Sequence, residues 1–265
     1  MIDTILVDDI TVACARPPTG DAAADPVLFI HGYFADARVW TGWLERFAAR
    51  GVPAYAVNLR GRAGSRPSTD LGRASIDDFV ADAARVAREL GKPAVVAHSM
   101  GGLIAQRLAA DDAVRAAVLI TPAPPRGITV LSLPLVVKQL KYLPSIAASR
   151  LVKPGREDMR ELVMNRVPPG EQDMLIDCLV PDSGRAAFEM SIAGVPVDRD
   201  RVRCPLLVIA ASDDRFVPRP IVERVAKRYE APLRTMHGHG HMVILEPGWQ
   251  QLADDVMQWI EQQAA

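Results

Sequence analysis

The chain has 265 residues, of which 49% are hydrophobic and 24% charged, and its formal net charge is −1. This length and composition suit one large globular domain, or a core domain that carries an insertion. The near balance of 31 basic and 32 acidic residues offers no attraction to polyanions, so nucleic acid and anionic membrane surfaces are excluded as expected partners.

The N-terminal segment, MIDTILVDDITVACARPP, lacks the basic start of a secretory signal and carries acidic residues at 3, 8 and 9. It predicts a pair of strands that enter the fold. The longest apolar stretches are too short to span a bilayer. Cys14, Cys178 and Cys204 are widely spaced and odd in number, so neither a disulfide framework nor a zinc site is expected. These features together predict a cytoplasmic protein.

Short apolar runs without alternation recur along the chain, as is typical of strands buried on both faces of a parallel sheet. They lie at 27–31, 54–59, 94–98, 117–121 and 205–210. Segments with a helical period lie around them, at 39–50, 76–90, 101–110, 221–230 and 248–263. This order of strands and helices predicts a doubly wound, mostly parallel α/β sheet.

The alternation stops after Thr121 and resumes at Pro205, where the next buried strand begins. The stretch between them predicts short helices broken by Pro and Gly. We therefore expect residues 122–197 to form a helical lid inserted after the sixth strand, with 1–121 and 198–265 forming the core. Within the lid, the Leu- and Val-rich stretch 130–146 either lines an acyl pocket or buries its apolar face on the core.

Ser99 lies in PAVVAHSMGG (93–102), after a predicted buried strand and before a predicted helix. A nucleophilic serine on a sharp strand-to-helix turn needs this context, although an ordinary turn serine also fits it. The backbone approaches itself closely at such a turn, which requires small residues such as Ala97 and Gly101. The N–H of Met100, at the helix N-terminus, is placed to stabilise an oxyanion.

A serine hydroxyl is a weak nucleophile unless a base takes its proton. The segment HGHGHMVILEP (237–247) offers three histidines. His241 is the preferred candidate because it follows Gly240 and precedes an apolar run, which places it on a loop after a late strand. His237 and His239 remain alternatives.

An acidic residue must orient the base, and LLVIAASDDRFVP (206–218) offers two. Asp213 and Asp214 both leave the C-terminal end of a buried strand, where the ligand sites of open α/β sheets lie. Either carboxylate is a candidate at this point.

Five segments resemble, in order, the motifs of the α/β-hydrolase superfamily, and within it the small serine esterases that carry a lid. These segments are VLFIHGYFADARVW, AVNLRGRAGS, AHSMGGLIAQRLA, LLVIAASDDRFVP and HGHGHMVILEP. The resemblance implies an eight-stranded sheet and a catalytic triad in the chain order Ser, Asp, His. It implies Ser99 as nucleophile, Asp214 as the acid because it lies four residues before Pro218, and His241 as the base of a G-H-x-x-x-x-E pattern.

The resemblance also implies a second oxyanion donor in the H-G-x turn after the third strand. In HGYF this is the backbone N–H of Tyr33, with Phe34 as the alternative. Two departures from the family pattern stand out: Ala97 replaces the usual Gly, and NLRGRAG replaces DLRGHG. A serine at the nucleophile position argues against the dehalogenase and epoxide-hydrolase branches, which use aspartate.

The predicted function is hydrolysis of carboxylic esters through an acyl-enzyme, on a small to medium, uncharged and apolar ester. No metal and no organic cofactor is implied. The same triad serves C–C bond hydrolases, lactonases, amidases, thioesterases, perhydrolases and acyltransferases, and these remain alternatives because fold does not select among them. A ligand receptor that kept the fold is the non-enzyme alternative.

Overall fold

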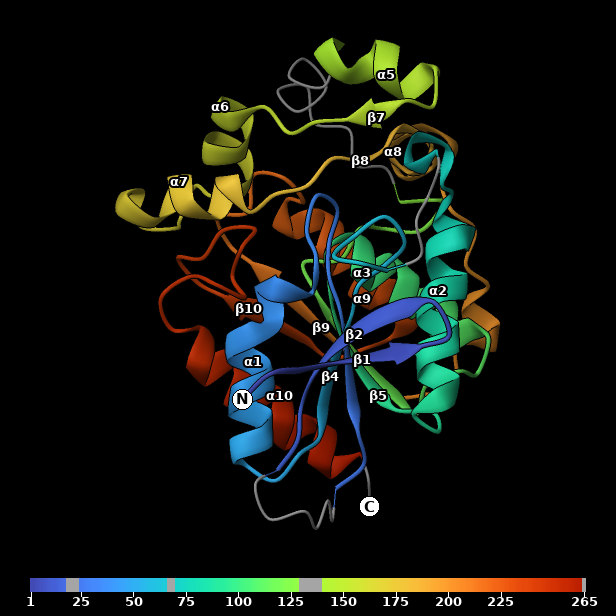
Figure 1. Ribbon diagram of the computed structural model, residues 1–265, viewed down its shortest axis with the longest axis vertical. Helices are drawn as coiled ribbons and strands as arrows, with labels where there is room; N and C mark the ends of the chain where they lie inside the picture. Colours follow the sequence, from blue (N-terminus) through green and yellow to red (C-terminus); the bar gives the residue numbers. More distant parts are fainter. Residues whose placement is uncertain (18–23, 66–69, 129–139, 264–265) are drawn as a thin grey trace.

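The computed structural model describes residues 1–17, 24–65, 70–128 and 140–263 (Figure 1). One sheet of eight strands has the order β1-β2-β4-β3-β5-β6-β9-β10. The strands are β1 (Asp3–Val7), β2 (Ile10–Ala15), β3 (Val27–Ile30), β4 (Ala54–Val57), β5 (Ala94–His98), β6 (Ala116–Ile120), β9 (Leu206–Ala211) and β10 (Leu233–Met236). β2 pairs antiparallel with β1 and β4, and every pair from β4 to β10 is parallel. The predicted doubly wound, mostly parallel sheet of eight strands is confirmed.

Helices cover both faces of this sheet (Figure 1). They are α1 (Thr41–Ala49) and α10 (Trp249–Gln262) on one face, and α2 (Ile76–Glu89), α3 (Met100–Ala110) and α9 (Arg219–Tyr229) on the other. The alternation of β3 side chains explains the two layers. Phe29 packs in one core with Trp43 of α1, whereas Leu28 packs in the other core with Phe79 of α2.

Helix α2 illustrates how the local sequence sets an element. Ser75 and Asp78 form a reciprocal capping box: the Ser75 hydroxyl accepts from the Asp78 N–H at 3.1 Å, and the Asp78 carboxylate accepts from the Ser75 N–H at 2.9 Å. Among the apolar residues at helical spacing, Phe79, Ala83 and Val86 are fully buried. Gly91 takes a φ of +70° just after the helix, a conformation that ends it.

A cap covers the carboxyl ends of the strands, between β6 and β9 (Figure 1). Its described elements are η3 (Leu140–Tyr142), α5 (Leu143–Ala147), β7 (Leu151–Val152), α6 (Arg156–Asp158), η4 (Met159–Val163), α7 (Pro169–Asp177), β8 (Asp182–Ser183), α8 (Gly184–Phe188) and η5 (Glu189–Ala193). The predicted insertion after the sixth strand of the core is confirmed, while its bounds at 122–197 stay a prediction. Of the stretch 130–146, residues up to 139 lie outside the described residues.

The two ends of the cap meet where it joins the core. The Arg126 N–H donates to the Val195 carbonyl at 2.8 Å, and the Arg126 Nε donates to the Gly194 carbonyl at 3.1 Å. The insertion therefore leaves and re-enters the core at one point.

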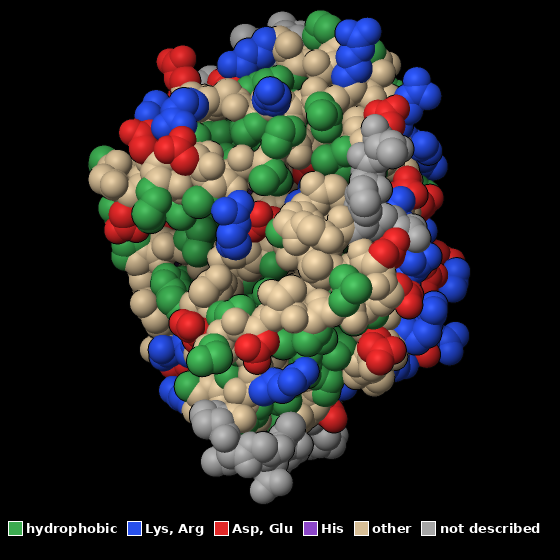
Figure 2. Space-filling view, viewed as in Figure 1, with side chains coloured by type: hydrophobic (Ala, Val, Ile, Leu, Met, Phe, Trp, Pro, Cys, Tyr) green, Lys and Arg blue, Asp and Glu red, His purple; other side chains and the backbone are tan. Residues whose placement is uncertain are grey.

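Two surface properties bear on the expected partners. Basic and acidic side chains are intermixed over the face drawn in Figure 2, so this face has no patch of a single charge. Within the described ranges, no helix is long and apolar enough to cross a membrane.

The three cysteines are free, and Cys178 is exposed.

Candidate active site

Ser99 lies between β5 and α3 with a φ of 54° and a ψ of −119°. This conformation is rare for a residue with a side chain and persists only where the surroundings hold it. Three hydrogen bonds do so: the Ser99 N–H donates to the Ile120 carbonyl at 3.1 Å, and its own carbonyl accepts from Gly102 and Ala123 at 2.9 Å each. The turn therefore holds the Ser99 side chain above the sheet.

The close backbone approach at this turn requires glycine on one side of the serine. A Cβ on Gly101 would clash with the Ile30 carbonyl oxygen and lie 2.7 Å from the His31 carbonyl oxygen. On the other side, Ala97 is fully buried, and its methyl group packs in the core beneath α3. The alanine in place of the usual glycine is therefore accommodated without strain.

Ser99, His241 and Asp214 form one hydrogen-bonded chain, and all three are buried. The Ser99 Oγ lies 3.1 Å from the His241 Nε2, and the His241 Nδ1 lies 2.8 Å from the Asp214 Oδ2. The other oxygen of Asp214 accepts from the N–H groups of Phe216 and Val217 at 2.8 Å each, which fixes the carboxylate. With Nδ1–H donating to Asp214, Nε2 is left to accept the serine proton.

The alternative acid and bases lie outside this chain of contacts. Asp213 accepts from the Ser212 hydroxyl at 2.8 Å and pairs with Arg166, and these hydrogen bonds lower the pKa of its carboxyl. His239 contacts the buried carboxylate of Glu246 at 3.1 Å, and His237 is exposed.

The two expected oxyanion donors, Tyr33 and Met100, differ from the alternative, Phe34, in the hydrogen bonds of their backbone N–H groups. The N–H groups of Tyr33 and Met100 donate to no protein atom in the described part of the chain. In contrast, the Phe34 N–H donates to the Asp182 Oδ2 at 2.9 Å. Of the two neighbouring donors in this turn, only Tyr33 is free to bind a new acceptor.

Two further histidines hold the loops of the site. The His98 Nε2 bonds the His241 carbonyl at 2.9 Å, and the His31 Nδ1 bonds the Gly32 carbonyl at 2.9 Å. Burial lowers the pKa of each to about 3, so both are neutral near pH 7. The ring of each hydrogen-bonds backbone near the pocket, and among the described residues neither ring hydrogen-bonds the Ser99 hydroxyl, which indicates a structural role.

Two supporting acids were not singled out by the sequence reasoning. Glu246 is fully buried and accepts from the Gly240 N–H at 2.8 Å, beside His241. Its signal was the last letter of the G-H-x-x-x-x-E pattern. Asp182 comes from the cap and has no motif around it, so no signal in the sequence would have found it.

The cavity at Ser99 is small and mostly apolar. Its volume is about 30 Å³, room for about one water molecule. Besides Ser99, His98, His241 and the loop 32–35, it is lined by Val39, Met159, Val163, Leu179, Phe216 and Met242. Among the described residues, the cap side chains Met159, Val163 and Leu179 therefore form part of the apolar wall that faces Ser99.

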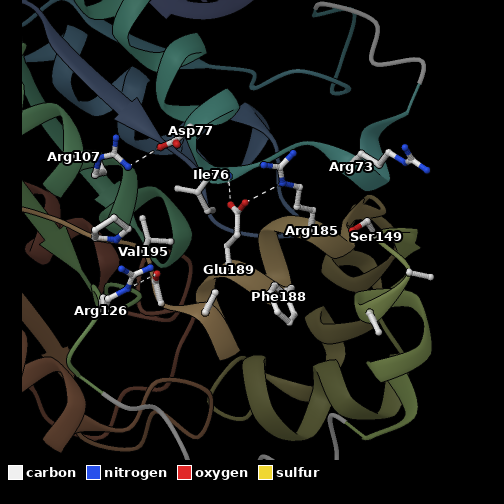
Figure 3. A pocket seen from close by; sticks show the side chains of 15 residues that line it. Arg73, Ile76, Asp77, Arg107, Arg126, Ser149, Arg185, Phe188, Glu189 and Val195 are labelled. Atoms are coloured by element: carbon white, nitrogen blue, oxygen red, sulfur yellow. Dashed lines mark hydrogen bonds and ion pairs between the residues drawn. The ribbon is translucent and has the colours of Figure 1, made fainter.

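A second, larger cleft of about 680 Å³ lies between α2 and the cap elements α8 and η5 (Figure 3). Arginines line it, but they already have partners: Arg107 pairs with Asp77 at 2.6 Å, and Arg185 with Glu189 at 3.0 Å. Glu189 also accepts from the Ile76 N–H at 2.7 Å, which joins the cap to the start of α2. The cleft shares no lining residue with the cavity at Ser99.

A family model described as "Alpha/beta hydrolase family" matches residues 27–254. A monoacylglycerol lipase of Mycolicibacterium smegmatis is 26% identical over 246 residues, which cover 88% of this chain and 87% of that protein.

Two solved structures are similar in fold. A thermophilic esterase from Thermogutta terrifontis superposes with a TM-score of 0.71 at 19% identity, and each chain is covered completely. A 2-hydroxy-6-oxo-6-phenylhexa-2,4-dienoate hydrolase from Rhodococcus sp. strain RHA1 has a TM-score of 0.70 at 18% identity, covering 97% of this chain and 99% of that one.

Proposed function

The chain belongs to the alpha/beta hydrolase family, and from this premise we propose that it is a serine hydrolase that cleaves carboxylic esters through an acyl-enzyme. One observation carries the proposal: Ser99, His241 and Asp214 are joined by contacts of 3.1 Å and 2.8 Å in a buried site. We assign them the roles of nucleophile, base and orienting acid.

In the first step His241 takes the hydroxyl proton of Ser99 as the oxygen attacks the ester carbonyl. Asp214 keeps the imidazole in the tautomer whose Nε2 accepts this proton, and it stabilises the imidazolium that forms. The alcohol then leaves with the proton from His241, and the acyl group stays on Ser99. Water enters by the same route, with His241 again as base, and releases the acid.

The negative charge that develops on the carbonyl oxygen needs donors that are already in place. We assign this role to the backbone N–H groups of Tyr33 and Met100, because neither has a protein acceptor in the described chain. Each such donor contributes about 2.7–4 kcal/mol to the stabilisation of the transition state.

The lining of the cavity supports a proposal about the substrate class. Apart from Ser99, His98 and His241, the side chains that line it are aliphatic or aromatic. We therefore propose a small to medium, uncharged and apolar ester. The monoacylglycerol lipase among the relatives is named for a substrate with an apolar acyl chain and an uncharged alcohol.

The test is turnover of a panel of p-nitrophenyl esters of rising acyl length, run beside a lactone, an amide, a thioester and a vinylogous diketone. We expect the esters to turn over fastest and an organophosphonate to form a covalent adduct on Ser99. The Ser99→Ala variant is the blank and should lose at least about a thousandfold in kcat/KM. Absence of both turnover and adduct in the wild type would sink the proposal, whereas fast cleavage of the diketone alone would favour a C–C bond hydrolase.

A further inference from the structure

The proposed oxyanion loop, residues 32–35, is backed by a segment of the cap. We call residues 180–183 the strap. Three hydrogen bonds join the two: the Val180 N–H donates to the Phe34 carbonyl at 2.9 Å, the Phe34 N–H to the Asp182 Oδ2 at 2.9 Å, and the Tyr33 hydroxyl to the Ser183 carbonyl at 2.7 Å. The strap therefore contacts the loop at Tyr33 and at Phe34, the residue that follows the Tyr33 N–H.

A buried ion pair fixes the strap to the core. Asp182 and Arg62 are in contact, and both side chains are fully buried. The Arg62 Nε donates to the Ala35 carbonyl at 3.2 Å, and its guanidinium lies 4.9 Å from the centre of the Phe79 ring. The pair thus binds the loop at two consecutive residues, through the N–H of Phe34 and the carbonyl of Ala35.

The backbone conformation of Phe34 explains why its N–H needs a charged acceptor such as Asp182. Phe34 has a φ of +64°, a conformation that is a genuine outlier for a bulky side chain and must be held by its surroundings. A charged acceptor holds an N–H more firmly than a neutral one does. A lone carboxylate behind the loop would also repel the developing oxyanion, and the Arg62 guanidinium offsets that charge.

We propose that Asp182 and Arg62 are positioning residues, which hold the loop so that the N–H of Tyr33 faces the oxyanion. The proposal rests on the proposed function. It also assigns a role to one of the two departures from the family motifs. In NLRGRAG, which stands where the family has DLRGHG, the arginine in place of the histidine is Arg62. The cap then does more than cover the pocket, since its strap completes the catalytic geometry of the core.

The test compares two double variants that both remove the buried charges. Asp182→Leu/Arg62→Met leaves the Phe34 N–H without an acceptor, whereas Asp182→Asn/Arg62→Gln keeps an oxygen there. Sites are counted by titration with the organophosphonate, so that kcat is given per intact Ser99. We expect the apolar pair to lower kcat per site by about tenfold to a hundredfold with KM within about threefold, and the polar pair to stay within about threefold.

The matched control is Glu189→Gln. Glu189 is also a cap carboxylate that accepts a core backbone N–H and pairs with an arginine, but it lies at the cleft of Figure 3 and not at the loop. It should leave kcat per site within about twofold. An unchanged kcat per site in the apolar pair, or an equal loss in the polar pair, would overturn the proposal.

Tyr33→Phe provides the second variant if the apolar pair yields no titratable sites. It removes one bond between loop and strap and leaves the buried charges in place. We expect a twofold to fivefold loss in kcat per site, on the order of one neutral hydrogen bond. An unchanged kcat would mean that the strap, to which Asp182 belongs, does not position the loop, and it would again overturn the proposal. Failure of the proposed function would be distinguishable, because it would be seen as inactivity of the wild type.

Discussion

At the scale of single residues, the site depends on two residues that adopt an unfavourable backbone conformation. Ser99 and Phe34 both have positive φ without being glycine, and each is held by hydrogen bonds to other segments. Such strain costs of order 1–3 kcal/mol per residue, which the surrounding contacts must offset. Small changes at these positions should therefore alter activity more than their size suggests.

Substitutions of the two small residues near Ser99, Gly101 and Ala97, should have different effects: one should lower activity and the other stability. Gly101→Ala places a methyl group against the backbone of β3, so we expect loss of at least about a hundredfold in kcat/KM on a short ester. Ala97→Gly only removes a buried methyl group and should cost about 1–2 kcal/mol of stability, with kcat within about threefold. Ester assays together with urea unfolding measure both effects. A fully active Gly101→Ala would contradict this reading of the turn.

At this scale the sequence predicted well wherever a residue sits inside a local motif. Ser99, Asp214 and His241 were named from short segments, and the structure brings the three together. Asp182 was not foreseen, because its contact with Arg62 joins positions far apart in the chain and neither residue type signals the other. Contacts of that kind arise from tertiary packing and leave no local pattern.

At the scale of elements, the core and the cap differ in how their sequences encode them. Helix α2 has a capping box, a continuous apolar face and a terminating glycine, and it begins at the predicted residue, Ile76. The predicted helix at 39–50 is instead split into η1 (Ala37–Trp40) and α1, because Asp36 caps an earlier turn. The cap elements are mostly too short for periodicity to define them, so only their presence and helical character could be predicted.

The short π-helix η4 should control which acyl chains enter the site. Met159 and Val163 come from it, line the cavity at Ser99 and are buried. Truncating either to alanine enlarges a cavity of about 30 Å³, so we expect kcat/KM for a hexanoate relative to an acetate ester to rise by about threefold to tenfold.

Ile176→Ala in α7 is the matched control for these two variants. Ile176 is equally buried in the cap but does not line the cavity. It should lower stability, by about 2–4 kcal/mol, and leave the acyl preference unchanged. The same change of preference in all three variants would mean that general loosening of the cap, and not the cavity wall, sets specificity.

At the scale of the whole molecule, folding stability should depend on two histidines that are buried neutral. His31 and His98 have native pKa values lowered to about 3, against an ordinary value of 6.5. Below pH 6.5 the unfolded chain binds protons at both positions while the native chain does not. Their contribution to stability is therefore present above pH 6.5 and is lost as the pH falls from 6.5 towards 3.

This dependence can be measured by urea unfolding at several pH values between 4 and 7. Between about pH 4 and 6, each buried histidine should add up to about 1.4 kcal/mol per pH unit to the slope of the unfolding free energy. His98→Gln keeps an N–H donor for the His241 carbonyl and removes one titrating group, so its slope should be smaller by about that amount. An identical slope for the variant and the wild type would contradict the neutral state assigned to His98.

The join between cap and core at Arg126 and Val195 has a consequence for how such molecules diversify. Because the two ends of the insertion lie next to each other, its length and sequence can change without altering the register of the sheet. Closing a longer loop between these ends costs little extra conformational entropy. The cap can therefore be replaced by another insertion while the core stays the same. Arg62 restricts such replacement, because a new cap must supply an acidic partner for the buried guanidinium. Without that partner, an unpaired buried charge would destabilise the fold.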